Sequence, residues 1–211
     1  MLNEKIDSNH LLDFLRNCLV QSHPPKPPNK IGKYQALRCA TKPHEAGGTF
    51  KKGESENLFD VKFESGVLEI PYFSVNFHTE CILQNLIALE LCDIDPAISD
   101  YITFWDALID SPEDVDLLNR SGIIYQRGDI KDVCNMFNKL GKEVAIDHEK
   151  YYFARIHEQL NGYCKIPWNK WMATLKRDYF GTPWATLSIG IAAILLLLTF
   201  IQAVCSIISV T

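Results

Sequence analysis

The segment DPAISDYITFWDALI, residues 95–109, decides the fold class. Apolar side chains recur in it at intervals of three and four residues, which is the pattern of a helix with one buried face. Asp95 and Pro96 suit the N-cap and the first position of that helix. The segment therefore predicts an amphipathic helix that packs into the core of a helical domain. Its apolar stripe consists of Ile98, Tyr101, Ile102, Trp105, Leu108 and Ile109.

Further helices are expected on both sides of this segment. Residues 79–92 are apolar on more than one face, so this helix should be central to the core. The other helices are recognised by acidic or proline residues at their starts and by glycine at their ends. They are expected at residues 10–20, from Ser111 to Gly122, from Asp129 to Gly141, from Asp147 to about Gly162, and from Pro167 onward.

Residues 58–73 have the alternation of a β-hairpin. Phe59, Val61 and Phe63 form one alternating apolar set, and a second set follows in residues 68–72. Between them, Glu64-Ser65-Gly66 places a glycine where a three-residue hairpin loop needs a left-handed residue. The predicted fold class is mainly α with one β-hairpin, followed by a single C-terminal transmembrane helix.

The transmembrane prediction rests on residues 184–210, which contain no charged side chain. A helix needs about 20 apolar residues to cross a bilayer core. Basic residues lie before this stretch and none follows it, so the positive-inside rule predicts cytosolic residues 1–180 in a single-pass, tail-anchored protein. The identity of the membrane stays open.

The segment before this stretch predicts a contact with the membrane interface. An amphipathic helix that carries tryptophan and basic residues suits a layer of anionic headgroups. The alternative is that Trp168 and Trp171 pack into the core while the basic residues only flank the span. The candidate interface residues are Trp168, Lys170, Trp171, Lys176, Arg177, Tyr179 and Trp184.

Residues 21–57 predict a flexible loop. Four prolines at positions 24, 25, 27 and 28 exclude a helix and favour an extended chain. The predicted organisation is an N-terminal helix at 1–20, this loop, a helical domain with a hairpin at 58–180, and the span at 184–210.

Composition argues against several classes of function. The net charge of −5 makes nucleic acid a poor partner, because such binding relies on Lys and Arg. The seven scattered cysteines suggest reduced thiols rather than a disulfide framework. Nucleophile and phosphate-loop motifs are absent from the sequence. We therefore predict no enzyme, no cofactor and no catalytic residue.

Three weak chemical patterns have simpler explanations. His78 and Cys81 have the spacing of zinc ligands, but no C-x-x-C pair accompanies them, so Cys81 and Cys92 are expected as small core residues. The segment DIDPAISD, residues 93–100, lacks the glycine and the closing Glu of a calcium loop. His148 or His157 near Cys164 would need a third, orienting group to form a catalytic pair. No metal site is predicted.

The order of these segments resembles the C-terminal half of the plant proteins catalogued as domain of unknown function 247. The segments that carry the resemblance are HLLDFLR at 10–16, FDVKFESGVLEIP at 59–71, LQNLIALELC at 83–92, YITFWDALIDSPEDVDLLNRSGII at 101–124, FNKLGKEV at 137–144 and YCKIPWNKWMATLKRDYFGTPWATLS at 163–188. The resemblance implies a single-pass membrane protein of unknown biochemistry, and a role in recognition. Members of the family are about twice as long, so residues 1–20 look like the remnant of a longer domain.

These observations predict a membrane-anchored interaction or signalling component without catalysis. Its expected partners are the lipid bilayer and an unidentified protein. Two alternatives stay open: a membrane-tethered enzyme whose site needs a missing N-terminal half, and a non-functional truncated fragment.

Overall fold

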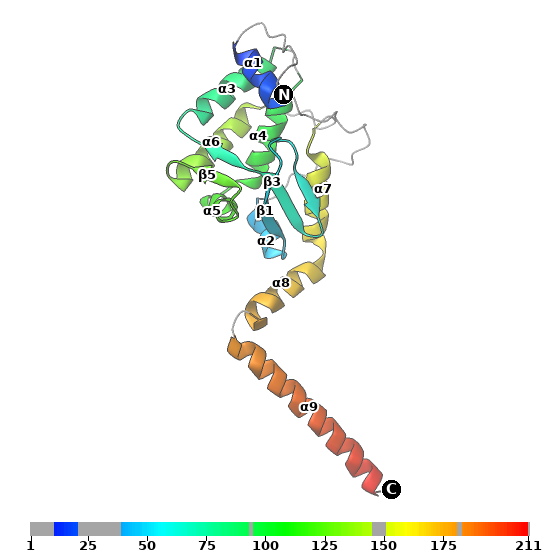
Figure 1. The fold of residues 1–211 in the computed structure, drawn as a ribbon. Coiled ribbons are helices and arrows are strands. Elements are labelled where there is room, and N and C mark those ends of the chain that lie inside the picture. Colours follow the sequence, from blue (N-terminus) through cyan, green and yellow to red (C-terminus); the bar gives the residue numbers. More distant parts are fainter. Residues whose placement is uncertain (1–10, 21–38, 93–94, 145–150, 181–182, 211) are drawn as a thin grey trace.

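The computed structural model describes residues 11–20, 39–92, 95–144, 151–180 and 183–210. Within these residues the helices are α1 (Leu11–Val20), α2 (Thr41–Glu45), α3 (Thr79–Glu90), α4 (Ala97–Leu108), α5 (Pro112–Arg120), α6 (Ile130–Glu143), α7 (Ala154–Lys165), α8 (Pro167–Phe180) and α9 (Pro183–Val210). The strands are β1 (Thr49–Gly53), β2 (Lys62–Glu64), β3 (Val67–Pro71), β4 (Phe73–Val75) and β5 (Ile124–Gln126). The expected mainly helical domain is confirmed, but it contains a three-stranded and a two-stranded sheet where one hairpin was expected. Figure 1 shows how its elements are arranged.

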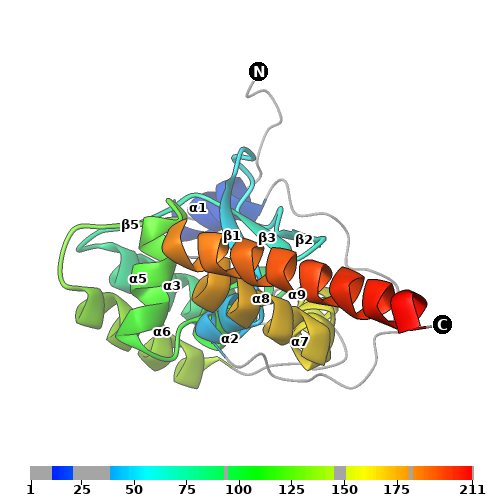
Figure 2. The same ribbon diagram turned by 90° about the horizontal axis from the view of Figure 1, so that it is seen from below.

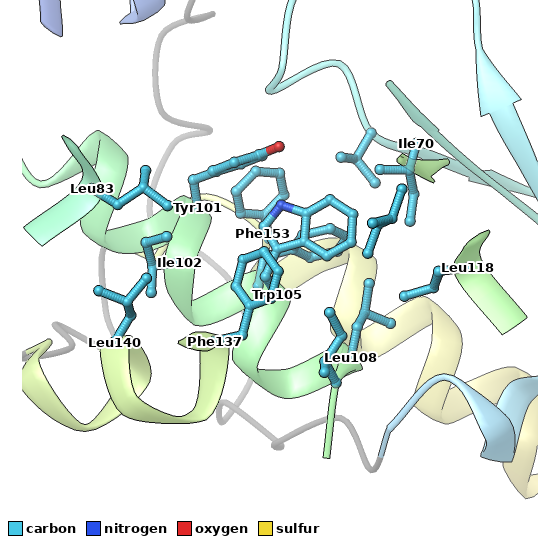
Figure 3. Packing of buried hydrophobic residues seen from close by; sticks show 14 of the residues in the cluster. Ile70, Leu83, Tyr101, Ile102, Trp105, Leu108, Leu118, Phe137, Leu140 and Phe153 are labelled. Carbon is cyan, nitrogen blue, oxygen red and sulfur yellow. The ribbon is translucent and has the colours of Figure 1, made fainter. Parts of the chain in front are cut away.

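Helix α4 forms the centre of the core. All six residues of the apolar stripe at 98–109 are buried. Figure 3 shows Trp105 surrounded by side chains from other elements, with Phe137 of α6 beside it. The ring centroids of Trp105 and Phe137 are 5.5 Å apart, and those of Phe104 and Phe153 are 4.7 Å apart. The sequence pattern of this helix therefore predicted its place in the fold correctly.

Strand β3 is the middle strand of a three-stranded sheet, with β1 parallel to it on one side and β2 antiparallel on the other. The predicted hairpin is confirmed as β2–β3. Its loop has two residues rather than three, because Glu64 already pairs with Val67. Ser65 and Gly66 have positive φ angles, of 50° and 83°, as in a type I′ turn. A second sheet pairs β4 with β5 in parallel.

Part of the segment expected as a loop has regular structure. Helix α2 and strand β1 both lie between residues 41 and 53. The backbone N–H of Thr49 donates to the carbonyl of Gly66 over 2.9 Å, which connects β1 to the hairpin turn. The proline-rich residues 21–38 lie outside the described part of the chain, so the prediction for them stays a prediction.

The N-cap position of α4 is Pro96 rather than the expected Asp95, and Glu90 of α3 accepts from the first N–H groups of the helix. Its carboxylate accepts from the backbone N–H groups of Ile98 and Ser99, both over 2.8 Å. The same carboxylate accepts from the guanidinium of Arg16 over 3.1 Å, and Arg16 also donates to the carbonyl of Asp95. Both charged side chains are buried. This network fixes α1 and α3 to the start of α4.

Two glycines that were expected to end helices lie inside them. Gly141 is within α6 and Gly162 is within α7. A Cβ atom at Gly141 would lie 2.3 Å from Cγ of Asp106 in α4, whereas a Cβ at Gly162 would meet nothing within 4 Å. Glycine at 141 therefore allows α4 and α6 to approach closely. By contrast, Gly122 follows α5 as predicted, with a positive φ of 71°.

The prediction of a C-terminal transmembrane helix was wrong on the evidence of the structure. Among the residues that the structure describes, no helix combines the length and the apolar character that crossing a bilayer requires. Helix α9 covers residues 183–210. The fold class, the single-pass location and the cytosolic placement of residues 1–180 are corrected accordingly.

Candidate interaction surface

Helix α8 presents a strip of apolar side chains to solvent. Positions 168, 171, 172 and 175 follow the i, i+3, i+4, i+7 spacing that brings side chains onto one helix face. We call these four residues the α8 strip. Their exposed fractions are 64% for Trp168, 77% for Trp171, 46% for Met172 and 44% for Leu175.

The junction between α7 and α8 positions the strip. The backbone N–H of Asn169 donates to the carbonyl of Ile166 over 3.2 Å. The side-chain amide of Asn169 donates to the carbonyl of Tyr163 over 3.1 Å, which satisfies an acceptor at the end of α7. Pro167 suits the first position of α8 because that position needs no N–H donor. As a result α8 leads away from the domain, with α9 beyond it (Figure 1). Seen from below, α8 and α9 lie in front of the remaining elements (Figure 2).

The structure locates two of the seven predicted interface residues. Trp168 and Trp171 are exposed, so the alternative in which both pack into the core is wrong. The other five side chains lie outside the described residues, and their place at a membrane interface stays a prediction. These five are Lys170, Lys176, Arg177, Tyr179 and Trp184. Sequence reasoning did not single out Met172 and Leu175 as site residues, although their spacing from the tryptophans was a sufficient signal.

A groove of about 410 Å³ lies between β2 and the start of α7. We call it the β2 groove. One wall is the strand itself, and the other comes from the segment that leads into α7 and from its first two turns. The lining residues are Val61, Lys62, Phe63, Glu64, Tyr152, Phe153, Arg155, Ile156 and Gln159. Sequence reasoning missed this groove because its two walls are about 90 residues apart in the chain.

Two basic residues that line the β2 groove, Lys62 and Arg155, differ in whether they form an ion pair. Nζ of Lys62 lies 2.9 Å from the carboxylate of Asp60, and that contact raises the pKa of Lys62. Arg155 is exposed, and the described residues contain no ion-pair partner for it. The groove therefore offers a guanidinium that is available to a carboxylate from outside.

The surroundings of Cys134, Cys164 and His157 do not favour an activated nucleophile. Burial raises the pKa of Cys134 and of Cys164, which disfavours the reactive thiolate at neutral pH. Burial lowers the pKa of His157 to about 4, and its Nε2 lies 3.3 Å from the Tyr151 hydroxyl. His148 lies outside the described residues, so a pair with Cys164 is untested there.

The structure also describes residues that were considered as metal ligands or as core cysteines. Among the described residues, no group of three or more His, Cys, Asp or Glu side chains could hold a metal ion. Cys81 and Cys92 are exposed rather than buried, so the expectation that they are small core residues was wrong. Cys81 lies within α3, and Cys92 lies just beyond the end of that helix.

A family model described as a plant protein of unknown function, DUF247, matches residues 2–198. The chain belongs to this family. Two curated relatives come from Arabidopsis thaliana. The UPF0481 protein At3g47200 is 24% identical over 163 residues, covering 75% of this chain and 34% of its own length. The putative UPF0481 protein At3g02645 is 29% identical over 164 residues, covering 75% of this chain and 31% of its own length.

The chain thus spans about a third of the length of these two curated relatives. No solved structure matches it. The family carries no described activity, so a function for this chain has to be argued from its own surface.

Proposed function

We propose that this DUF247 chain is a protein-interaction component that inserts α8 into an apolar groove of a partner protein. The supporting observation is the α8 strip, in which two tryptophans, a methionine and a leucine are exposed on one helix face. Such i, i+3, i+4, i+7 anchors are the means by which an amphipathic helix binds a hydrophobic groove.

The free energy of burying apolar side chains favours the burial of this strip against a partner. Burying an exposed Leu or Met side chain gains roughly 1.5–3 kcal/mol. Tryptophan is enriched among the interface residues whose removal costs at least about 2 kcal/mol of binding energy. Trp168 and Trp171, one turn apart, can fill adjacent pockets of such a groove.

Charge narrows the chemistry of the partner. The sequence of α8 contains Lys170, Lys176 and Arg177 but only one acidic residue, Asp178. The helix is therefore net basic. A groove with an apolar floor and an acidic rim complements it, and like-charge repulsion would disfavour a basic partner.

The test uses the full chain with a photo-cross-linking amino acid at position 171, expressed in plant cells, and a control with the same amino acid at the exposed position 158 of α7. We expect a protein to be cross-linked from position 171 and not from position 158. The captured protein is then purified and titrated against the full chain. Trp171→Ala should weaken binding at least about 30-fold, since 2 kcal/mol corresponds to that ratio. Glu158→Ala should leave Kd nearly unchanged.

Two results would contradict the proposal. One is a captured protein that binds Trp171→Ala as tightly as the unmodified chain. The other is the absence of any protein partner, together with binding to anionic lipid vesicles that Trp171→Ala abolishes. That second result would assign the α8 strip to a lipid surface instead.

A further inference from the structure

Among the described residues, no strand lies beside the outer edge of β2. In the part of the chain that the structure describes, the sheet order is β1-β3-β2, so β2 pairs only with β3. The register places Glu64 opposite Val67 and Phe63 opposite Leu68. Residues alternate along an antiparallel pair between hydrogen-bonded and non-hydrogen-bonded positions, and a two-residue turn closes on a hydrogen-bonded pair. Phe63 therefore directs its N–H and C=O away from β3, toward the open edge.

The β2 groove is lined by the residues of this edge strand. Helix α7 and the segment before it contact the strand region at two places: the rings of Phe59 and Tyr152 are 6.1 Å apart, and those of Phe63 and Tyr163 are 5.6 Å apart. Residues 61–64 line one side of the space of about 410 Å³, and residues of α7 and the segment before it line the other. This volume is within the range of roughly 300–1,000 Å³ that is typical of ligand sites.

The side chains that line the groove suit an extended peptide with an apolar and an acidic side chain. Phe63 is half-buried and Ile156 is half-buried, so each leaves apolar surface in the groove. Arg155 adds the available guanidinium, which binds carboxylates through two parallel hydrogen bonds. Side chains two positions apart lie on the same face of a strand. An apolar residue followed two positions later by Asp or Glu can therefore face both features together.

We propose that the β2 groove binds an extended, acidic peptide segment of another protein, which adds to the sheet as a fourth strand beside β2. Main-chain hydrogen bonds to Phe63 would supply part of the affinity, as in other cases of strand addition. Arg155 would supply the selectivity for an acidic residue. This site is separate from the α8 strip and does not depend on the function proposed for it.

A peptide titration tests this proposal. The probe is a fluorescein-labelled heptapeptide, Thr-Val-Thr-Asp-Thr-Val-Thr, titrated against the full chain and followed by fluorescence anisotropy. One matched control replaces its Asp by Asn, and a second carries an N-methyl group on its central residues, which removes donors to the strand edge. We expect the unmodified probe to bind, and each control to bind at least ten times more weakly.

A charge exchange then tests Arg155. The variant Arg155→Glu should lose binding of the acidic probe at least tenfold and gain binding of a probe with Lys in place of Asp. Arg155 is exposed, so this variant should fold normally, with an unchanged circular dichroism spectrum. Absence of binding by the unmodified probe, equal affinity of the N-methylated probe, or no exchange of preference in Arg155→Glu would each overturn the proposal.

Discussion

Replacing Gly141 by alanine should destabilise the domain, whereas the same change at Gly162 should stabilise it. Both glycines lie inside helices, where alanine is favoured over glycine by roughly 0.5–1 kcal/mol. At Gly162 nothing opposes this gain, since the new Cβ would meet no atom within 4 Å. At Gly141 the new Cβ would lie 2.3 Å from Cγ and 2.4 Å from an oxygen of Asp106.

The magnitude follows from that contact. Ordinary van der Waals contact needs about 3.5–4 Å, so α4 and α6 or the Asp106 side chain must move by more than 1 Å. Overpacking of this kind costs about 1–3 kcal/mol. After the helical gain, Gly141→Ala should lose between about 0 and 2.5 kcal/mol, while Gly162→Ala gains up to about 1 kcal/mol. The difference between the two variants isolates the overpacking cost.

Urea unfolding of the full chain, followed by circular dichroism, measures both changes under the same conditions. A third variant provides the control: in an Asp106→Ala background, Gly141→Ala should no longer be destabilising, because the contacting carboxylate is gone. Equal stabilisation by both glycine replacements would refute the reasoning. It would show that α4 and α6 do not approach as closely as the structure has them.

Two further predictions concern buried charged or titratable groups. Glu90→Ala should destabilise the domain by about 3–5 kcal/mol, because it leaves the buried Arg16 guanidinium unpaired and uncaps the N–H groups of Ile98 and Ser99. Arg16→Met should cost less in the same urea titration, since Glu90 keeps its backbone donors; an equal or larger cost would contradict this view of the network. His157 has a pKa of about 4 in the folded state, against 6.5 when unperturbed, so the neutral form stabilises the fold above pH 6.5 and this stability is lost as the pH falls toward 4. The loss should be about 3 kcal/mol and should be absent in His157→Phe; a stability that is flat over this range in the unmodified chain would exclude a buried neutral imidazole.

Local signals explain most of what the sequence predicted. The α5 start was predictable because Ser111 and Asp114 form a capping box within one turn. The N-cap role of Asp129 was also predictable from neighbouring residues, because its side chain accepts from the N–H of Lys131, two positions later. The hairpin followed from strict alternation and from a glycine in the turn. In each case the deciding interactions lie within a few residues of one another.

The parts that sequence reasoning missed depend on partners far away in the chain. Strand β5 has only three residues, and its pairing with β4 is invisible to any local pattern. Gly141 was expected to end a helix because glycine commonly does so, but its role depends on Asp106 in another helix. The backbone N–H groups at the start of α4 donate to Glu90 of α3, although Asp95, just before α4, was the N-cap candidate in the sequence.

The two candidate sites also differ in how far the sequence could predict them. The α8 strip was partly predictable, since the spacing of Trp168 and Trp171 is a local helical pattern. Its exposure was not predictable, because exposure depends on where the junction after α7 directs the helix. The β2 groove could not be inferred at all, because it exists only once α7 has folded back beside the hairpin.

The pairing of β4 with β5 has a consequence for the order in which the molecule folds. The register joins Phe73 to Ile124, about 50 residues apart, with α3, α4 and α5 in between. Closing a chain loop of that length costs roughly 3–4 kcal/mol of entropy. Three-residue strands return little energy, so the pair should form late, after the intervening helices have packed. The amides of Phe73 and Arg127, which donate to Ile123 and Val75 across this pair, should therefore be protected from hydrogen exchange only in the completed fold.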